Sequence, residues 1–179
     1  MDFAIAGLEI LKYVIPSLVV FGVTYMILQK FLEDNYSRKL LDIRTKNSEL
    51  ITPVRLQAYE RLILLLERIS PNNLVLRLNH PGITAGQFKG ELISSIHEEF
   101  NHNLSQQIYV SPQAWALIKA VKEQVINLIN TSYVSLADDA KSIDLSKAIF
   151  ERMIQLEDVP TQKALDFIRK EVQLVFFQN

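Results

Sequence analysis

Residues 53–69, PVRLQAYERLILLLERI, decide how the rest of the chain can fold. The run LILLL at 62–66 is apolar on every side for more than one helical turn, and a helix that is apolar all round is buried. Thr52 suits a helix N-cap, and Pro53 suits the first helical position. Ser70 and Pro71 supply turn chemistry at the other end. We therefore expect a new helix over residues 53–69, forming the central element of a core.

Downstream of this helix, the chain repeats the signals that open helices. Thr84 and Gln87 fit a capping box, and Ser111-Pro112 repeats the Thr52-Pro53 pattern. We expect Asp144 to cap one further helix and Thr161 to open the last one. Apolar residues recur at helical spacing in two of these segments: Trp115, Ile118, Val121, Val125, Leu128 and Ile129; then Leu165, Ile168, Val172 and Val175.

Two stretches between these helices are less clearly patterned. LVLRLNHPGI at 74–83 fits either a short helix or an extended piece, and ADDAKSIDL at 137–145 is the connection that we expect to be mobile. The chain has no internal repeat. These patterns predict an all-α fold, with a bundle of about five helices in residues 52–179.

Upstream, residues 13–28 read YVIPSLVVFGVTYMIL and carry no charge. Lys12 and Lys30 flank them, Tyr13 and Tyr25 lie near the two ends, and Pro16 would permit a kink. A spanning helix needs about 20 residues, so residues 1–32 predict a transmembrane anchor. A signal peptide, a buried core helix and a surface helix are the alternatives. The run has no A-x-A cleavage site and no strongly charged face.

Positive charge follows the apolar run rather than preceding it. Lys30, Arg38, Lys39, Arg44 and Lys46 come after it, whereas only Lys12 precedes it, against Asp2 and Glu9. Because positive loops stay in the cytoplasm, we expect the C-terminal domain there and a short N-terminus outside.

Residues 33–51 contain no proline or glycine and carry a sparse apolar stripe that includes Tyr36, Leu40, Ile43 and Leu50. We expect the membrane helix to continue through them as a stalk, ending where the helical domain at 52–179 begins. The alternatives are a surface helix folded onto the domain, or a short self-associating stalk.

Composition excludes several classes of function. The chain has 179 residues, enough for one ordinary domain, and a net charge of −1, which gives no support for nucleic-acid binding. It has no cysteine, so thiol catalysis and thiolate metal sites are excluded. No phosphate-binding glycine motif occurs among its five glycines. We expect no cofactor and no small-molecule substrate.

The segment HEEFNH at 97–102 resembles the H-E-x-x-H helix of zinc peptidases. That motif needs two histidines about 40° apart on a helix, at positions i and i+4. His97 and His102 are five residues apart, which places them about 140° apart. Glu98 lies opposite the apolar face of this helix, where a solvated charge belongs. We therefore expect no metal site and no catalytic residue.

The residues that follow offer a candidate contact instead. Asn103 falls within the apolar face of its helix, so its amide needs a partner. It either caps the helix end or contacts another subunit. Our candidate partner-contact residues are Asn103, Gln106, Gln107, Tyr109, Phe176 and Phe177, and our candidate lipid- or partner-binding basic residues are Lys30, Arg38, Lys39 and Arg55. For Arg55, Arg61 and Arg68, the alternative is solvated charge or ion pairs with nearby glutamates.

The segments ITPVRLQAYERLILLLERISPNNLVLRL at 51–78 and HEEFNHNLSQQIYVS at 97–111 resemble an uncharacterised family of small, single-span membrane-anchored proteins from Bacteroidota. The resemblance runs from the membrane helix to about residue 130, and the last fifty residues carry none. It implies a bacterial inner-membrane protein and transfers no catalytic residue.

Together these features predict a non-enzymatic accessory or scaffold subunit of a bacterial cytoplasmic-membrane complex, bound to membrane lipid and to other subunits. One alternative is a homo-oligomeric membrane organiser built through the stalk and the helix at 53–69. Another is a hydrolase with an unrecognised site, which would need a deep polar pocket with perturbed carboxylates.

Overall fold

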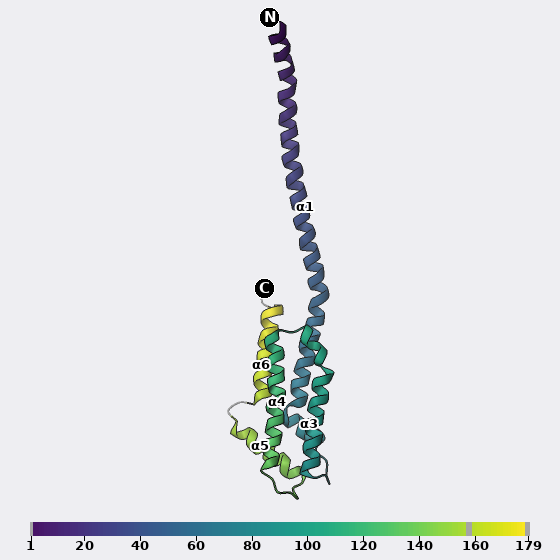
Figure 1. Cartoon of the computed structure of the whole chain (residues 1–179), viewed down its shortest axis with the longest axis vertical. Coiled ribbons are helices and arrows are strands. Elements are labelled where there is room, and N and C mark those ends of the chain that lie inside the picture. The colour runs from purple at the N-terminus through teal and green to yellow at the C-terminus, as the bar shows by residue number, and fades with distance from the viewer. Residues whose placement is uncertain (1, 157–158, 178–179) are drawn as a thin grey trace. The chain divides into compact units, whose positions relative to one another are not determined.

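The computed structural model describes residues 2–156 and 159–177; the side chains of residues 2–11, 37, 40, 44 and 47, among them Leu40 and Arg44, lie outside the description. The chain divides into two compact units, Met1–Leu50 and Ile51–Asn179. Helix α1, Asp2–Ile69, contains residues 2–32 of the predicted anchor and the whole of the predicted stalk (Figure 1). The prediction that the first helix continues through residues 33–51 is confirmed.

The new helix start expected at Thr52-Pro53 is wrong, because α1 passes through both residues without a break. Proline lacks the N–H that would bond to the carbonyl four residues earlier, so the helix loses one backbone hydrogen bond there. The buried side chains among residues 58–69, which include Tyr59, Leu62 and Leu66, hold the helix beyond that point. The division between the two units falls beside the same Thr-Pro pair.

Among the residues that the structure describes, one helix is long and apolar enough to cross a membrane, judged by length and composition alone. Within it, an 18-residue window of the segment Lys12–Ile69 has a mean hydropathy of 1.6 and is fully exposed. The polar side chains near this window bond to their own helix. Ser17 Oγ donates to the Val14 carbonyl at 2.8 Å, and Gln29 Nε2 donates to Tyr25 Oη at 3.2 Å.

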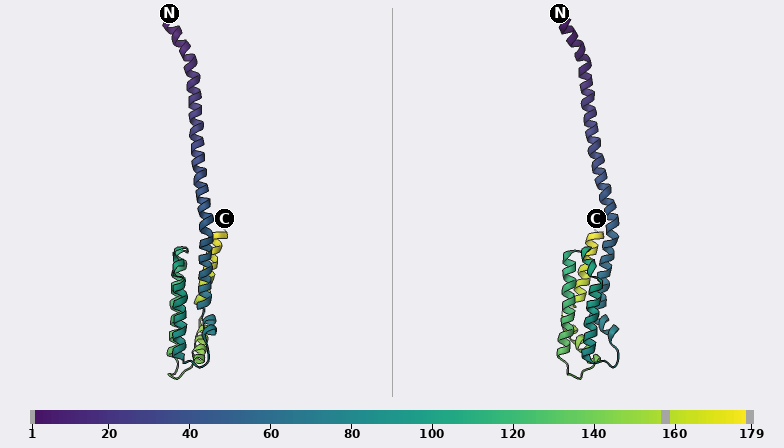
Figure 2. Two further views of the ribbon diagram at one scale, coloured as in Figure 1. Left: turned by 90° about the vertical axis from the view of Figure 1, so that its right-hand side faces the viewer. Right: turned by 45° about the vertical axis from the view of Figure 1, so that its right-hand side comes forward.

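The second unit is an antiparallel four-helix bundle with two shorter helices. Residues 51–69 of α1 pack lengthwise with α3 (Ala85–His102), α4 (Pro112–Val134) and α6 (Pro160–Val172) (Figure 2). Helices α2 (Pro71–Leu78) and α5 (Ser142–Gln155) pack against α3. A 3₁₀ turn, η1 (Leu104–Ile108), follows α3, and a π-helical turn, η2 (Gln173–Phe177), follows α6. The described residues form no strand, so the predicted all-α class is confirmed.

The core of the bundle lies between these four long helices. Its fully buried side chains come from all of them and from α2 and α5, and include Tyr59, Leu62, Leu66, Phe88, Leu92, Ile96, Ile118, Ile129, Leu145 and Ile168. The prediction that residues 62–66 are buried on every side is partly wrong. Leu62, Leu65 and Leu66 are buried, but Leu64 is 60% exposed. Leu64 therefore lies on a side of α1 that the rest of the bundle leaves largely exposed.

Of the four helix starts predicted downstream of residue 69, two are confirmed. Thr84 and Gln87 form the capping box, and Ser111 Oγ accepts the Ala114 N–H at 3.0 Å. The other two lie slightly upstream of the expected residue. Helix α5 begins at Ser142, and Asp144 in its first turn accepts the Lys141 N–H at 2.9 Å rather than capping the helix itself. Helix α6 begins at Pro160, so Thr161 lies inside its first turn.

Residues 74–83, for which the sequence fitted either a short helix or an extended piece, contain the end of α2 followed by a turn. Asn79 is extended, and Gly82 has φ +93°, a conformation that favours glycine. The connection expected to be mobile is held to this turn by two backbone bonds. Ala85 N–H donates to the Ala140 carbonyl at 2.9 Å, and Ser142 N–H donates to the Ile83 carbonyl at 3.2 Å. These bonds fasten the α2–α3 connection to the α4–α5 connection.

Candidate functional site

Three separate segments meet at one end of the bundle, which we call the proximal end: residues 51–59, residues 103–111 and residues 171–177. Arg55 contacts both of the other segments. Its Nε donates to the Tyr109 carbonyl at 3.2 Å, and its guanidinium lies 5.5 Å from the ring centroid of Phe176. One cation therefore fastens η1 and η2 to α1.

Tyr59 is the buried centre of the proximal end. Its hydroxyl donates to Glu171 Oε1 at 2.7 Å and accepts the Ser111 N–H at 3.4 Å. The edge of its ring meets Phe176, with the ring centroids 5.9 Å apart and the planes at 77°. The Tyr59 side chain makes all three contacts because it lies beside the start of α4 and the end of α6.

Burial raises the pKa of Tyr59 above its ordinary value of 10.0, and the hydrogen bond and negative charge of Glu171 raise this pKa further. Both effects penalise the phenolate, which would be a buried anion beside a carboxylate. Tyr59 is therefore a protonated donor at neutral pH. Glu171 Oε2 is buried without a hydrogen-bond partner among the described residues, so Tyr59 supplies the only hydrogen bond that this carboxylate accepts there.

Sequence reasoning missed both Tyr59 and Glu171. A signal was present for each: Tyr59 lies three residues before the buried Leu62, and Glu171 lies three residues after the buried Ile168. Residues three apart share one face of a helix. Each polar group thus continues the core-facing stripe of its helix.

Four predicted contact residues lie in or beside η1. Asn103 is buried, and its Nδ2 donates to the Glu99 carbonyl at 2.9 Å, so its amide ends α3 as the capping alternative predicted. Gln106 donates to Ser105 Oγ at 3.3 Å, and Gln107 is exposed. The Tyr109 side chain is also exposed, while its carbonyl is held by Arg55.

The two predicted contact residues at the C-terminus differ from each other. Phe177 is 71% exposed. Phe176 was expected to be exposed as well, but it is half-buried between Tyr59 and Arg55. The π-helical turn of η2 directs these neighbouring rings to different surroundings. Of the pair, only Phe177 presents most of its ring to a partner.

The predicted basic residues fall into two groups. Lys30, Arg38 and Lys39 are exposed along α1 in the first unit. Arg55 belongs to the bundle and is half-buried, with its guanidinium engaged by Tyr109 and Phe176. The lipid- or partner-binding role of Arg55 stays a prediction, and the structure adds that this side chain holds the proximal end together.

Large apolar side chains are exposed around the same end. They come from all three segments: Ile51, Val54, Leu104, Ile108, Tyr109, Leu174, Val175 and Phe177. Ile108 and Phe177 are the most exposed, at 72% and 71%. Clusters of exposed apolar side chains mark sites of interaction. We call these eight residues the proximal patch.

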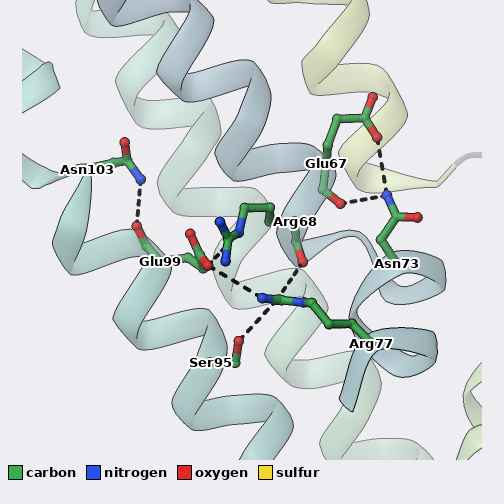
Figure 3. Close-up of polar contacts among 7 residues, drawn as sticks. All are labelled: Glu67, Arg68, Asn73, Arg77, Ser95, Glu99 and Asn103. Carbon is green, nitrogen blue, oxygen red and sulfur yellow. Dashed lines mark hydrogen bonds and ion pairs between the residues drawn. The ribbon is translucent and has the colours of Figure 1, made fainter. Parts of the chain in front are cut away.

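A second polar cluster ties α1 to α2 and α3 (Figure 3). Arg68 Nε lies 2.6 Å from Glu99 Oε1, and Arg77 of α2 lies 3.7 Å from the same oxygen. Arg77 also donates to the Arg68 carbonyl at 3.3 Å and to Ser95 Oγ at 3.2 Å. The ion-pair reading of Arg68 is confirmed, although its partner lies on another helix.

The histidines do not converge. His97 and His102 are exposed on α3, and His80 Nδ1 contacts the Leu78 carbonyl at 2.9 Å in the turn after α2. The described residues contain no group of three or more histidine, aspartate or glutamate side chains placed to hold a metal ion. A hollow of about 590 Å³ between α4, α5 and α6 has no carboxylate or histidine among its lining residues in the part of the chain that the structure describes.

A family model described as a family of unknown function, DUF7935, matches residues 6–175. The match covers most of the chain, so the chain belongs to this family. It also extends well past residue 130, which corrects the narrower resemblance expected from the sequence. No curated protein and no solved structure matches the chain.

Proposed function

The chain belongs to the DUF7935 family. We propose that it is a non-enzymatic accessory subunit of a bacterial membrane complex. A single spanning helix in residues 1–32 anchors it in the cytoplasmic membrane, with the bundle on the cytoplasmic side. The bundle binds other subunits of the complex.

The proximal patch is the observation that carries this proposal. Eight large apolar side chains from three segments are exposed at one end of the bundle. The Arg55–Tyr59 cluster beneath them holds these segments in place, and a preorganised surface loses less entropy on binding. A protein partner would remove this apolar area from water.

A tagged full-length chain, extracted in mild detergent and analysed by mass spectrometry, tests the proposal. We expect defined partner subunits to copurify. The double variant Ile108→Asp/Phe177→Asp should reduce their recovery about tenfold or more, because it charges the most exposed part of the patch. Ile154→Asp is the matched control, since Ile154 is 84% exposed but lies on α5. Recovery of a lone monomer contradicts the proposal.

A homo-oligomeric membrane organiser is the second candidate. Tyr36, Ile43 and Leu50 are exposed on α1 and spaced seven residues apart, as in a coiled-coil seam. Light scattering of the purified chain in detergent separates the candidates. A defined oligomer that Ile43→Asp dissociates supports the organiser, whereas a monomer that acquires other subunits supports the accessory role.

A further inference from the structure

The stalk at residues 33–51 presents one row of large apolar side chains to solvent. Tyr36, Ile43 and Leu50 are 67%, 56% and 73% exposed, and they are seven residues apart, which is the repeat of one seam position in a coiled coil. Sequence spacing assigns the other seam position to Leu40 and Asn47, each four residues after one of these residues and three before the next. We call these five residues the stalk seam.

Basic residues border the stalk seam. Lys39 and Lys46 each lie three residues after one exposed seam residue and four before the next, at the g positions of the heptad. Both lysines are exposed. Arg44 takes the e position, which borders the seam on its other side. From residue 30 to residue 51 no e or g position is acidic, so the charge that flanks the seam is positive.

Most acidic residues of the stalk lie farther from the seam. Residues 33–51 contain four acids and four bases. At 100° per residue, Lys39 and Lys46 lie about 60° and 80° from the centre of the seam. Three of the acids lie about 120–160° from it: Asp34, Asp42 and Glu49. The fourth, Glu33, falls on the line of the seam, just before its first residue. In the part of the chain that the structure describes, Asp42 forms no ion pair with either lysine. The stalk is neutral as a whole, but the border of its seam is positive.

Two copies of this chain would repel each other along the stalk seam. In a parallel pair, the g residue of one helix meets the e residue of the following heptad on the other helix. Lys39 would therefore face Arg44 of the second copy, and an antiparallel pair would bring lysines opposite lysines. Like charges at these positions disfavour pairing, whereas carboxylates opposite them favour it. The charge pattern thus points to a helix of a different chain, with acidic residues beside its own apolar seam.

We infer that the stalk seam forms a heterotypic coiled coil with an acid-flanked amphipathic helix of another subunit, an inference that rests on the accessory function proposed above. Apolar residues of that helix pack on Tyr36, Ile43 and Leu50, and its carboxylates pair with Lys39 and Lys46. The seam is about two heptads long, which is short for a coiled coil between free chains. Under this proposal both subunits are anchored in one membrane, so their effective concentration is high and a short seam suffices.

Site-specific photo-crosslinking of the full-length chain in its native membrane tests this inference. The photoreactive residue replaces Ile43, which is 56% exposed, and the matched control carries it at Leu41, which is 60% exposed. Leu41 is two residues away and about 160° round the same helix. The crosslinked peptide is sequenced by mass spectrometry. We expect a peptide of another protein in which apolar residues recur at heptad spacing with acidic residues beside them, at a yield at least five times that of the control.

Charge variants supply the second arm. Lys39→Glu should lower the Ile43 crosslink at least threefold, because it sets a carboxylate against the acidic flank of the partner. Arg38→Glu makes the same change of charge on the far side of the helix and should leave the yield within twofold. A homotypic coil would respond in the opposite sense, because Lys39→Glu places a carboxylate opposite Arg44 of the second copy.

A crosslink from Ile43 to lipid, to a second copy of this chain or to a neutral or basic peptide overturns the inference. A yield no higher than that at Leu41 overturns it as well, as does an equal response to the two charge variants. If partner subunits still copurify with the full-length chain, the proposed function survives such a result. If none copurifies, both fail.

Discussion

Helix α1 contains two apolar runs with opposite surroundings. Residues 62–66 lie in the bundle, where three of the five leucine and isoleucine side chains are buried by other helices. Residues 13–28 are as apolar, yet every one of them is exposed in the described structure. Both runs must leave water. One leaves it by packing against protein, and we propose that the other leaves it in a lipid bilayer.

The comparison shows what a hydropathy pattern contains. It predicts that a run is removed from water, but it does not identify what covers the run. The charged residues in the same stretch of helix decide whether protein or a bilayer covers the run. Residues 53–69 carry five charges, Arg55, Glu60, Arg61, Glu67 and Arg68, whereas residues 13–28 carry none. A bilayer centre rejects such charges, so only the second run fits a membrane.

Truncation of the buried run should have the largest effect. Leu62→Ala removes a fully buried side chain, and we expect it to lower the free energy of unfolding of the bundle by about 4 kcal/mol. Leu64→Ala, two residues away on the exposed side, should change it by less than about 0.5 kcal/mol. Urea unfolding, followed by the fluorescence of Trp115, measures both. Equal effects of the two variants would contradict the burial assigned to the run.

A charge in the exposed run should oppose insertion of the helix into the membrane and leave the stability of the bundle unchanged. Val20→Arg places a cation at the middle of the proposed span and should oppose insertion by about 3 kcal/mol. The fraction of the chain that resists carbonate extraction measures insertion. The urea midpoint of the bundle should not change, and Val20→Leu is the control for side-chain size. Full resistance to extraction in the arginine variant would argue against a spanning helix.

The hydrogen bond between Tyr59 and Glu171 should contribute less to the free energy of unfolding than the burial of Leu62. Tyr59→Phe removes the hydrogen bond to Glu171 and leaves a buried carboxylate without a donor, at a cost of about 2 kcal/mol.

The pH dependence of stability gives an independent check. Because the pKa of Tyr59 is raised in the folded chain, the folded state binds its proton more tightly than the unfolded state. Its contribution is complete below the unfolded pKa of about 10. It is lost as the pH rises through the folded value. The fall in stability above that pH should therefore be smaller in Tyr59→Phe than in the wild type. An equal fall in both would show that Tyr59 does not titrate in this range.

The ion pair near the other end of the buried run should have the smallest effect. Glu99→Gln removes the charge that faces Arg68 and Arg77, and we expect a loss of about 1 kcal/mol, because Arg68 is 55% exposed. Glu98→Gln, on the exposed side of α3, is the matched control and should be nearly neutral. Added salt should reduce the difference between the two variants.

Features that depend on neighbouring residues were predictable from the sequence. The caps at Thr84 and Ser111 join atoms three residues apart, so their chemistry is visible in a short window. The start of α5 was misplaced by three residues and the start of α6 by two. At α5, the deciding contact comes from elsewhere, since a backbone bond to Ile83 holds Ser142.

The candidate sites were less predictable, because their partners are distant in sequence. Tyr59 and Glu171 are 112 residues apart, and Arg55 and Tyr109 are 54 apart. Arg55 and Phe176 were each chosen as surface residues, but contact with each other removes much of their surface from a partner. Nothing in either local sequence encodes that contact.

By itself the sequence determined that the chain is helical and that His97 and His102 lie about 140° apart on their helix. It also predicts that residues 13–28 and 62–66 are removed from water. Each of these follows from periodicity and charge within a few turns of helix. Tertiary structure alone decided which side of residues 62–66 stays exposed and which polar groups meet at the proximal end. Those outcomes depend on how α3, α4 and α6 pack around α1, and packing is a property of distant segments brought together.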